Sequence, residues 1–282
     1  MKLEESHTRS KVIDFRLDLH THTTCSDGVL SPKELLDRAK EAGLSGISIT
    51  DHDTLAAYTE ETIAYAEKLG LLLLTGVELS TFFERKSVHI LGYLVSTKSE
   101  SLNKLLHRLQ QRRLKRNRVI MEKLSRLAIV VREEELQEIG DLSALGRPHI
   151  AQIMVRKGYV PSIEKAFKKY LGEGCPCYDA GEMVPTDEAI TAIHNAGGKA
   201  FLAHPHLIKK QRFIKKLLEL PFDGLEGHYG SFRKEDDEKW IKIAKEHNLL
   251  LSGGSDFHGH DNVHAKLGSS WITTEDYEAL IR

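Results

Sequence analysis

The feature that most constrains this 282-residue chain is a series of short apolar runs that each lead into histidine or acidic residues. Helix-favouring stretches separate most of these runs, which is the order typical of β/α units. A strand that ends in unpaired imidazole or carboxylate groups is costly to bury, so the repetition predicts that something pairs these groups. The runs are 15–20, 46–50, 71–78, 88–95, 199–203, 222–226 and 249–254.

The seven runs predict an α/β fold, namely a distorted seven-stranded (β/α) barrel of the TIM type with a helical insertion domain. Between the fourth and fifth runs the sequence is charged and favours helices, and it contains no strand-like run. We therefore expect a first barrel segment at 1–98, a helical insertion that caps the substrate at 99–180, and a second barrel segment at 181–282.

Charge and composition narrow the range of partners. Forty basic residues oppose forty-one acidic ones, and this balance argues against a stable DNA complex or an anionic membrane as partner. The first ten residues lack a signal-peptide pattern and no later run is long enough to span a bilayer, so we expect a cytoplasmic location. Three cysteines without a CxxC pair predict reduced thiols. The oligomeric state is not indicated.

Nine side chains at or near the predicted strand ends are candidate metal ligands, because α/β barrels build their active sites from the loops there. Two of them, His20 and His22, are two residues apart in an extended segment and so face the same side. A lone histidine is more often a hydrogen-bonded structural residue, but the repeated placement of the set predicts a cluster of bound metal ions. The other candidates are Asp27, His52, Glu78, His89, His204, Asp256 and His258.

The ligand types indicate the metal and the chemistry. Imidazole and carboxylate groups without thiolate suit zinc, manganese or iron better than calcium or magnesium. Closely spaced ions of this kind generate hydroxide near neutral pH and neutralise charge on a phosphoryl group, so we expect hydrolysis of a phosphate ester by metal-bound hydroxide. The residues predicted to serve this catalysis directly are Asp27, His52, Glu78 and His204.

Six short segments resemble, in order, the motifs of the polymerase and histidinol phosphatase (PHP) superfamily: 18–22, 26–28, 49–53, 76–78, 203–205 and 254–258. The resemblance implies three metal positions. One would be held by His20, His22, Glu78 and Asp256, a second by Glu78, His89 and His204, and a third by Asp27, His52 and His258.

Within the insertion, the sequence Gly-Arg-Pro-His-Ile-Ala at 146–151 is similar to the branch of nucleoside 3',5'-bisphosphate phosphatases, which also degrades short RNA from the 5' end. This resemblance implies that Arg147 and His149 bind a substrate phosphate, although both could instead cap a helix start. The implied substrate is the 3'-phosphate of a nucleoside 3',5'-bisphosphate, with 5'-phosphorylated short RNA as a second substrate. Two alternatives are a phosphatase of another metabolite, such as histidinol phosphate, and a catalytically silent module that binds nucleic acid or a polymerase.

A basic stretch at 104–126 has two interpretations. It carries seven arginines and lysines between Lys104 and Arg126 against the single acid Glu122, together with an apolar face of leucines. The charged face could be solvated and neutralised by the acidic residues 133–138, or it could attract a polyanionic substrate. The sequence assigns no role to His206, His228 or Cys25.

Overall fold

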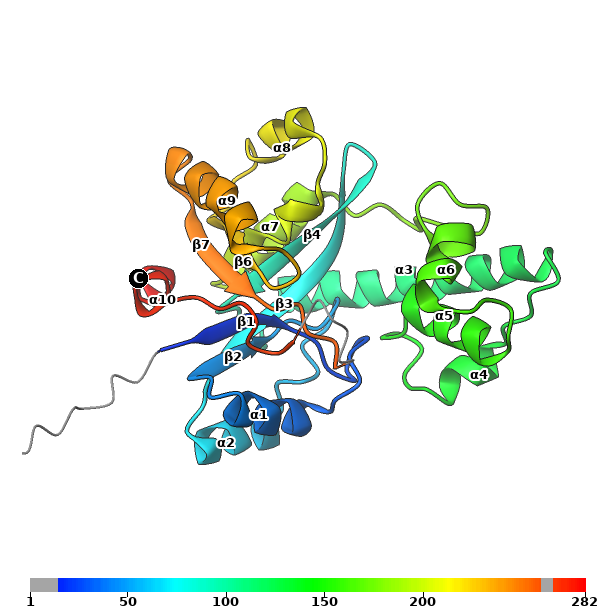
Figure 1. Ribbon diagram of the computed structural model, residues 1–282, viewed down its shortest axis with the longest axis horizontal. Coiled ribbons are helices and arrows are strands. Elements are labelled where there is room, and N and C mark those ends of the chain that lie inside the picture. The colour runs from blue at the N-terminus through cyan, green and yellow to red at the C-terminus, as the bar shows by residue number, and fades with distance from the viewer. Residues whose placement is uncertain (1–14, 260–265) are drawn as a thin grey trace, which may run out of the picture.

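The computed structural model describes residues 15–259 and 266–282, so 1–14 of the predicted first barrel segment and 260–265 of the second lie outside the described residues. Seven strands form one curved sheet in sequence order (Figure 1). Bridges from Thr21 to Phe257 and from Leu17 to Ile272 bring the two edges together, so the barrel is nearly closed. The strands are β1 (Leu17–Thr21), β2 (Gly46–Ile49), β3 (Leu72–Phe83), β4 (Lys86–Tyr93), β5 (Lys199–Leu202), β6 (Gly224–Tyr229) and β7 (Leu250–Gly254).

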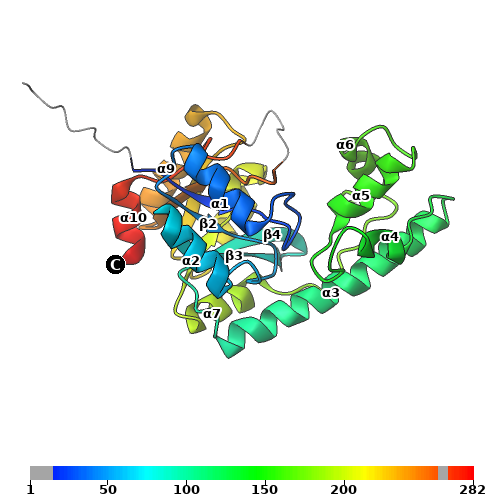
Figure 2. The same cartoon turned by 90° about the horizontal axis from the view of Figure 1, so that it is seen from below.

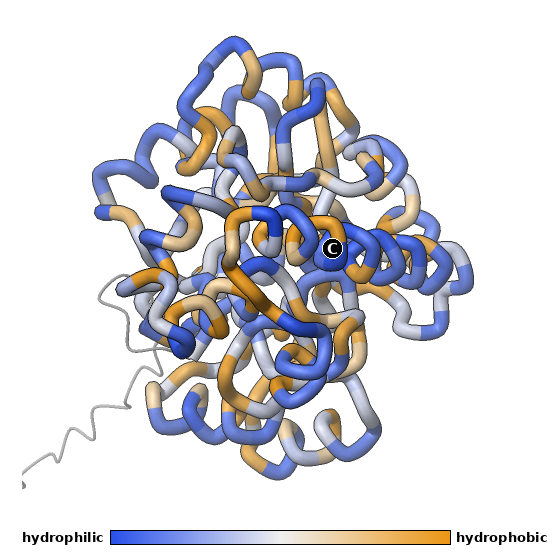
Figure 3. Tube along the Cα trace, turned by 90° about the vertical axis from the view of Figure 1, so that its right-hand side faces the viewer, coloured by the Kyte–Doolittle hydropathy of each residue, from blue (hydrophilic) through white to orange (hydrophobic). Residues whose placement is uncertain are grey.

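The predicted seven-stranded α/β barrel is confirmed, and helices cover its outer face. Residue Ser31 caps the first helix, with Pro32 at its first position and Glu34 completing a capping box, as its sequence predicts. Much of the core lies between strands and helices, as where Leu36 and Ile47 share one cluster, whereas the outer turns are mostly hydrophilic (Figure 3). The helices around the barrel are α1 (Pro32–Glu41), α2 (Glu60–Leu69), α7 (Thr186–Asn195), α8 (Gln211–Leu217), α9 (Lys234–Glu246) and α10 (Thr274–Ile281), with a 3-10 turn η2 (Pro205–Leu207) after β5.

One strand departs from the expected β/α alternation. β4 pairs antiparallel with both β3 and β5, whereas the other pairs are parallel. No helix separates β3 from β4, because Glu84 and Arg85, at φ 44° and 64°, turn the chain directly back in a tight hairpin. The β/α alternation predicted from the sequence is therefore broken between the third and fourth runs. β3 also continues to Phe83, so Glu78 lies within a strand and not at its end.

Most of the chain between β4 and α7 forms the helical insertion, which extends to one side of the barrel along its longest helix (Figure 2). Its helices are α3 (Glu100–Ser125), α4 (Glu133–Gln137), α5 (Arg147–Arg156), α6 (Ile163–Ala166) and the π-helical turn η1 (Phe167–Leu171). Side chains such as Ile120, Ile150 and Leu171 form a core separate from those of the barrel. Among the described residues, no helix is both long enough and apolar enough to cross a membrane.

Candidate metal centre

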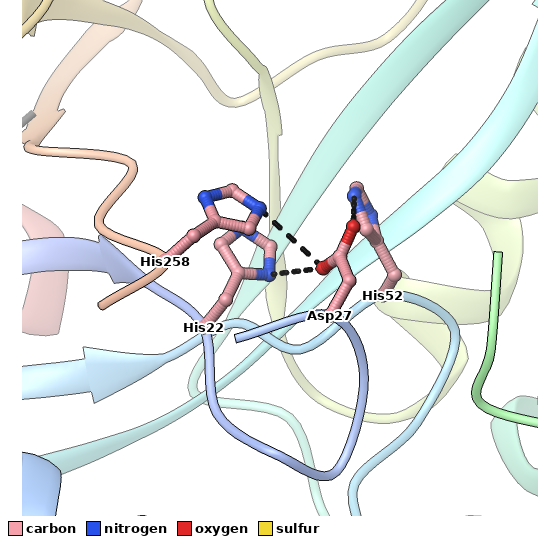
Figure 4. Close-up of side chains that lie close together, drawn as sticks. All are labelled: His22, Asp27, His52 and His258. Atoms are coloured by element: carbon pink, nitrogen blue, oxygen red, sulfur yellow. Dashed lines mark ion pairs between the residues drawn. The ribbon is translucent and has the colours of Figure 1, made fainter. Parts of the chain in front are cut away.

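The structure brings all nine predicted ligand side chains together at one end of the barrel, and Figure 4 shows four of them. They come from six of the seven strands or from the loops that follow them. β1 and its loop supply His20, His22 and Asp27; the segment after β2 supplies His52. β3 and β4 supply Glu78 and His89, the turn after β5 supplies His204, and the segment after β7 supplies Asp256 and His258.

The carboxylate of Glu78 lies at the centre of this cluster and is almost fully buried. One of its oxygens, Oε1, lies 2.8 Å from a nitrogen of His89 and 3.0 Å from one of His204. The other, Oε2, lies 3.0–3.3 Å from nitrogens of His20, His22 and His52. Since the two oxygens face different histidines, this one carboxylate can bridge two cations.

Three overlapping groups of side chains are close enough to hold one cation each. The first is the set that the family resemblance implies, His20, His22, Glu78 and Asp256. A second contains the implied Asp27, His52 and His258, with His22 added. The last contains Glu78 and His89 with His52 in place of the implied His204, although His204 faces the same Glu78 oxygen as His89.

Unpaired nitrogens inside the cluster show that its residues fit divalent ions. His20 Nε2, both ring nitrogens of His22 and His52 Nδ1 are buried and lack a hydrogen-bond partner among the described residues. Leaving these groups unpaired in a buried site is costly. Because a divalent ion accepts imidazole lone pairs and neutralises the neighbouring carboxylates, ions bound at these positions would satisfy the whole set.

The electrostatics of the cluster point the same way. Burial tends to raise the pKa of the Asp27, Glu78 and Asp256 carboxyls, but the surrounding histidines outweigh burial and hold each pKa well below its usual range. Burial also tends to lower the pKa of His22, yet Asp256 and Glu78 raise it to about 9. Buried carboxylates in this number call for positive charge at the centre.

Close backbone packing holds the ligands in place. A side chain at Gly254 would lie 2.4 Å from the Cβ of His20, and one at Gly28 would lie 2.4 Å from the carbonyl oxygen of His22. His204 and Asp256 have φ values of 28° and 55°, a strained conformation that clusters at functional sites when the surrounding structure enforces it. The close packing explains why glycine stands near the ligands at positions 28 and 254.

Two acidic residues beside His52 support the cluster from outside. Asp51 accepts hydrogen bonds from the Thr23 backbone N–H at 2.7 Å and from the Ser26 hydroxyl at 2.6 Å, so it shapes the loop that carries Asp27. Asp53 accepts a hydrogen bond from the Ser80 N–H at 2.8 Å and pairs with an arginine of the insertion.

The predicted phosphate-binding residues of the insertion lie at the start of α5. Arg147 donates to the Leu171 carbonyl at 3.2 Å, and its guanidinium lies over the rings of Phe167 and Tyr178. His149 Nδ1 accepts from the Gly146 N–H at 3.0 Å, so this histidine does cap the helix start, as the alternative interpretation allows. Burial lowers the pKa of both side chains, and the charges of Asp27 and His258 act on His149.

Sequence reasoning missed three arginines on the inner face of α3. Arg112, Arg113 and Arg116 are only 6, 6 and 9% exposed, so the interpretation of a solvated face is wrong for them. Arg113 pairs with Asp53, and Arg112 donates to the Ser80 carbonyl at 2.8 Å. Of the outward basic residues, Arg118 pairs with Glu133 of the acidic segment at 3.0 Å, whereas Arg108 pairs with Glu182 and Glu188.

Arg116 stands apart from its neighbours because no acidic group pairs with it among the described residues. Its one hydrogen bond there goes to the side-chain oxygen of Asn117 at 3.4 Å, and its Nε has no partner. Burial, together with the positive charges of Arg113 and Arg147, holds the Arg116 pKa well below its usual range. Asp53 and Asp179 act on Arg116 without forming an ion pair with it. A buried guanidinium that no acid contacts directly is costly, so this position favours an anionic ligand.

Comparisons with known proteins give this centre its class. Over 86% of this chain and 90% of the other, it is 36% identical to a 5'-3' exoribonuclease of Haemophilus influenzae. It is 32% identical to a 3',5'-nucleoside bisphosphate phosphatase of Chromobacterium violaceum, covering 94% of both. The chain also resembles a solved structure from Bifidobacterium adolescentis, whose assignment as a metal-dependent phosphoesterase is itself an inference. The two superpose with a TM-score of 0.84 at 30% identity, covering 94% of this chain and 95% of that one.

The fold, the cluster and these relatives define the protein as a metal-dependent hydrolase that acts on phosphoric esters. The catalytically silent alternative is set aside by this result. The chain belongs to the PHP family, because the PHP domain model matches its residues 18–173.

Proposed function

We propose that this protein removes the 3'-phosphate of nucleoside 3',5'-bisphosphates and also acts on 5'-phosphorylated short RNA. This proposal rests on two groups of residues that require ligands of opposite charge. The barrel cluster calls for cations, and the buried Arg116, which lies with Arg113 at the start of α5, calls for an anion. A substrate with two phosphates satisfies both, since one can meet bound ions and the other the arginines.

The nine ligands would hold two to three ions of manganese, zinc or iron. Bound divalent ions supply a nucleophilic hydroxide at neutral pH and offset the negative charge of the phosphoryl oxygens. In this proposal Asp27, His52, Glu78 and His204 are the catalytic residues that lie nearest the reacting phosphate. Such a reaction needs no side-chain nucleophile, because the hydroxide serves as the nucleophile.

The second phosphate would bind between the barrel and the insertion. Arg147 and His149 at the start of α5 would contact it, joined by Arg113 and Arg116 from α3. A side chain at Gly146 would lie 3.1 Å from the Arg113 guanidinium and 3.8 Å from that of Arg116, so α5 begins directly beside both. Guanidinium groups gathered in this way suit a phosphate, which accepts paired hydrogen bonds.

Two relatives support a nucleotide substrate. The protein of Chromobacterium violaceum is described as a nucleoside bisphosphate phosphatase and that of Haemophilus influenzae as an exoribonuclease. Both substrates present a phosphorylated nucleotide. The arginine group would be unused by a substrate with a single phosphate, such as histidinol phosphate, and this weighs against that alternative.

The test is phosphate release from adenosine 3',5'-bisphosphate with added manganese, compared with release from a simple aryl monophosphate. We expect His22→Ala to lose both activities. Arg147→Ala should lose mainly the preference for the bisphosphate, while Arg118→Ala, which changes an arginine paired with Glu133 on the outer face, should match the wild type. If the wild type hydrolyses the aryl ester but ignores the bisphosphate, the nucleotide assignment is wrong and the metal mechanism stands.

A further inference from the structure

One strand of the barrel supplies none of the nine candidate ligands. β6 lies between β5 and β7, and two of its side chains reach the cluster from behind. Glu226 is fully buried and Tyr229 is nearly so. Their contacts are with three candidate ligands that belong to other parts of the chain.

Glu226 joins two of these ligands. Its Oε1 lies 2.9 Å from Nδ1 of His20, and its Oε2 accepts the backbone N–H of His204 at 2.6 Å. Because a carboxylate oxygen is a hydrogen-bond acceptor, this contact favours the His20 tautomer whose proton is on Nδ1. Nε2 of the same ring is then left as a lone pair that faces Glu78 and Asp256, each 3.3 Å away.

Tyr229 supports the third ligand. Its hydroxyl donates to Oδ2 of Asp256 at 2.8 Å. The other oxygen of the same carboxylate, Oδ1, faces His20 at 3.3 Å and His22 at 3.2 Å. The hydrogen bond therefore fixes which oxygen of Asp256 points into the cluster.

A local irregularity in β6 lets both residues face the same way. Residues three apart in a regular strand point to opposite faces. Here Glu226 pairs with Ser252 and His228 with Gly253, so Gly227 is an extra residue without a partner on β7. Such a bulge re-aims the side chains that follow it. A side chain at Gly227 would lie 2.5 Å from Leu251, which explains the glycine.

We propose that the bulged strand β6 is the outer support of the metal centre, with Glu226 and Tyr229 as positioning residues for His20, His204 and Asp256. This inference rests on the metal centre of the proposed function. Hydrogen bonds to the far side of ligands fix the tautomer and the ring orientation that a metal needs.

Glu226→Gln tests the role of the carboxylate at nearly constant volume. An amide has one accepting and one donating end, whereas both partners of Glu226 are donors. If the amide oxygen faces the His204 N–H, its NH₂ faces Nδ1 of His20 and drives the proton to Nε2, which blocks metal binding there. The reverse orientation places two donors against each other at His204. Either way the match to the cluster is lost.

The experiment measures metal binding directly, by competition with a chromophoric chelator and by the visible absorption of cobalt(II)-loaded protein. We expect Glu226→Gln to bind cobalt about 10–100-fold more weakly, and Tyr229→Phe about tenfold more weakly, with altered cobalt spectra. The matched control is Asp237→Asn. Asp237 is another buried carboxylate beside β6, but it faces His206 at 3.1 Å and His228 at 3.4 Å and touches none of the nine ligands. It also accepts the backbone N–H of Tyr229 at 3.4 Å, a bond that the amide oxygen of asparagine can keep.

The outcomes separate this inference from the proposed function. If the wild type binds no divalent ion, the metal centre itself is wrong. If the wild type binds cobalt and both variants match its affinity and spectrum, the role of β6 is overturned while the metal centre stands. Should Glu226→Gln fail to fold, judged by circular dichroism, Tyr229→Phe decides the question, since it removes a single hydroxyl. Weaker binding by Asp237→Asn equal to that of Tyr229→Phe would also overturn the inference.

Discussion

The barrel end and the inner face of the insertion solve opposite electrostatic problems. At the barrel end, Asp27, Glu78 and Asp256 concentrate negative charge among histidines whose lone pairs are unsatisfied. On the inner face of α3, Arg116 is buried near other guanidinium groups, and no acid among the described residues forms an ion pair with it. Neither region is balanced alone. The difference teaches that the two regions call for ligands of opposite sign, which is the basis of the proposed bisphosphate substrate.

Removing the divalent ions should have the largest effect, because it acts on the whole barrel end at once. We expect a chelator to abolish hydrolysis and to lower the free energy of unfolding, by about 3 kcal/mol relative to protein in metal at a hundredfold excess over Kd. Phosphate release and chemical denaturation measure the two effects. Unchanged hydrolysis after exhaustive chelation would show that the barrel end does not need cations.

Glu78→Gln should come next, since it removes the one carboxylate that faces five histidines. We expect a fall in kcat of about a thousandfold, comparable to or beyond the loss of one electrostatic group in other hydrolases. Steady-state kinetics on both the bisphosphate and an aryl phosphate should show the same fall. A loss confined to the bisphosphate would mean that Glu78 serves substrate choice and not the metals.

Arg116→Met should act selectively and with opposite signs on binding and stability. We expect kcat/KM for the bisphosphate to fall about a hundredfold, the worth of a charge-assisted hydrogen bond or two, with little change for an aryl phosphate. The free energy of unfolding should rise by about 1 kcal/mol, because an unpaired buried charge is replaced by an apolar chain. Urea titration checks the sign, and a less stable variant would show that Arg116 is a structural residue.

Arg118→Met should have the smallest effect, although it lies two residues away on the same helix. Its guanidinium is exposed and pairs with Glu133, and exposed pairs of this kind contribute about 0–1 kcal/mol. We expect kinetic constants within about twofold of the wild type. A large loss for RNA substrates, steeper at low salt, would extend the binding surface to the outer face of α3.

Sequence alone predicted most of the barrel and its cluster, for a physical reason. Apolar runs such as 46–50 and 249–254 are buried between helices, so their polar ends mark one rim of the barrel. The hairpin at Glu84 and Arg85 was missed because neither residue favours positive φ.

The inner arginines and the support from β6 were harder to predict. Which face of a basic helix is buried depends on where the insertion packs, and periodicity does not give that for Arg113 or Arg116. Glu226 did carry a signal, since it ends an apolar run as the ligands do. Its role depends on the bulge at Gly227, which shifts the strand by one residue and leaves no clear mark in the sequence.

Because β4 runs in the reverse direction, the length of α3 determines where the insertion is placed. β4 leaves the barrel at the end opposite the metal centre, so the chain must return to the rim before it can place the insertion there. The 26 residues of α3 extend about 39 Å. Each residue also turns the helix by about 100°. A single residue inserted before Arg112 would therefore turn Arg113 away from Asp53. Both the length of α3 and the rotational position of its side chains are therefore constrained by the site.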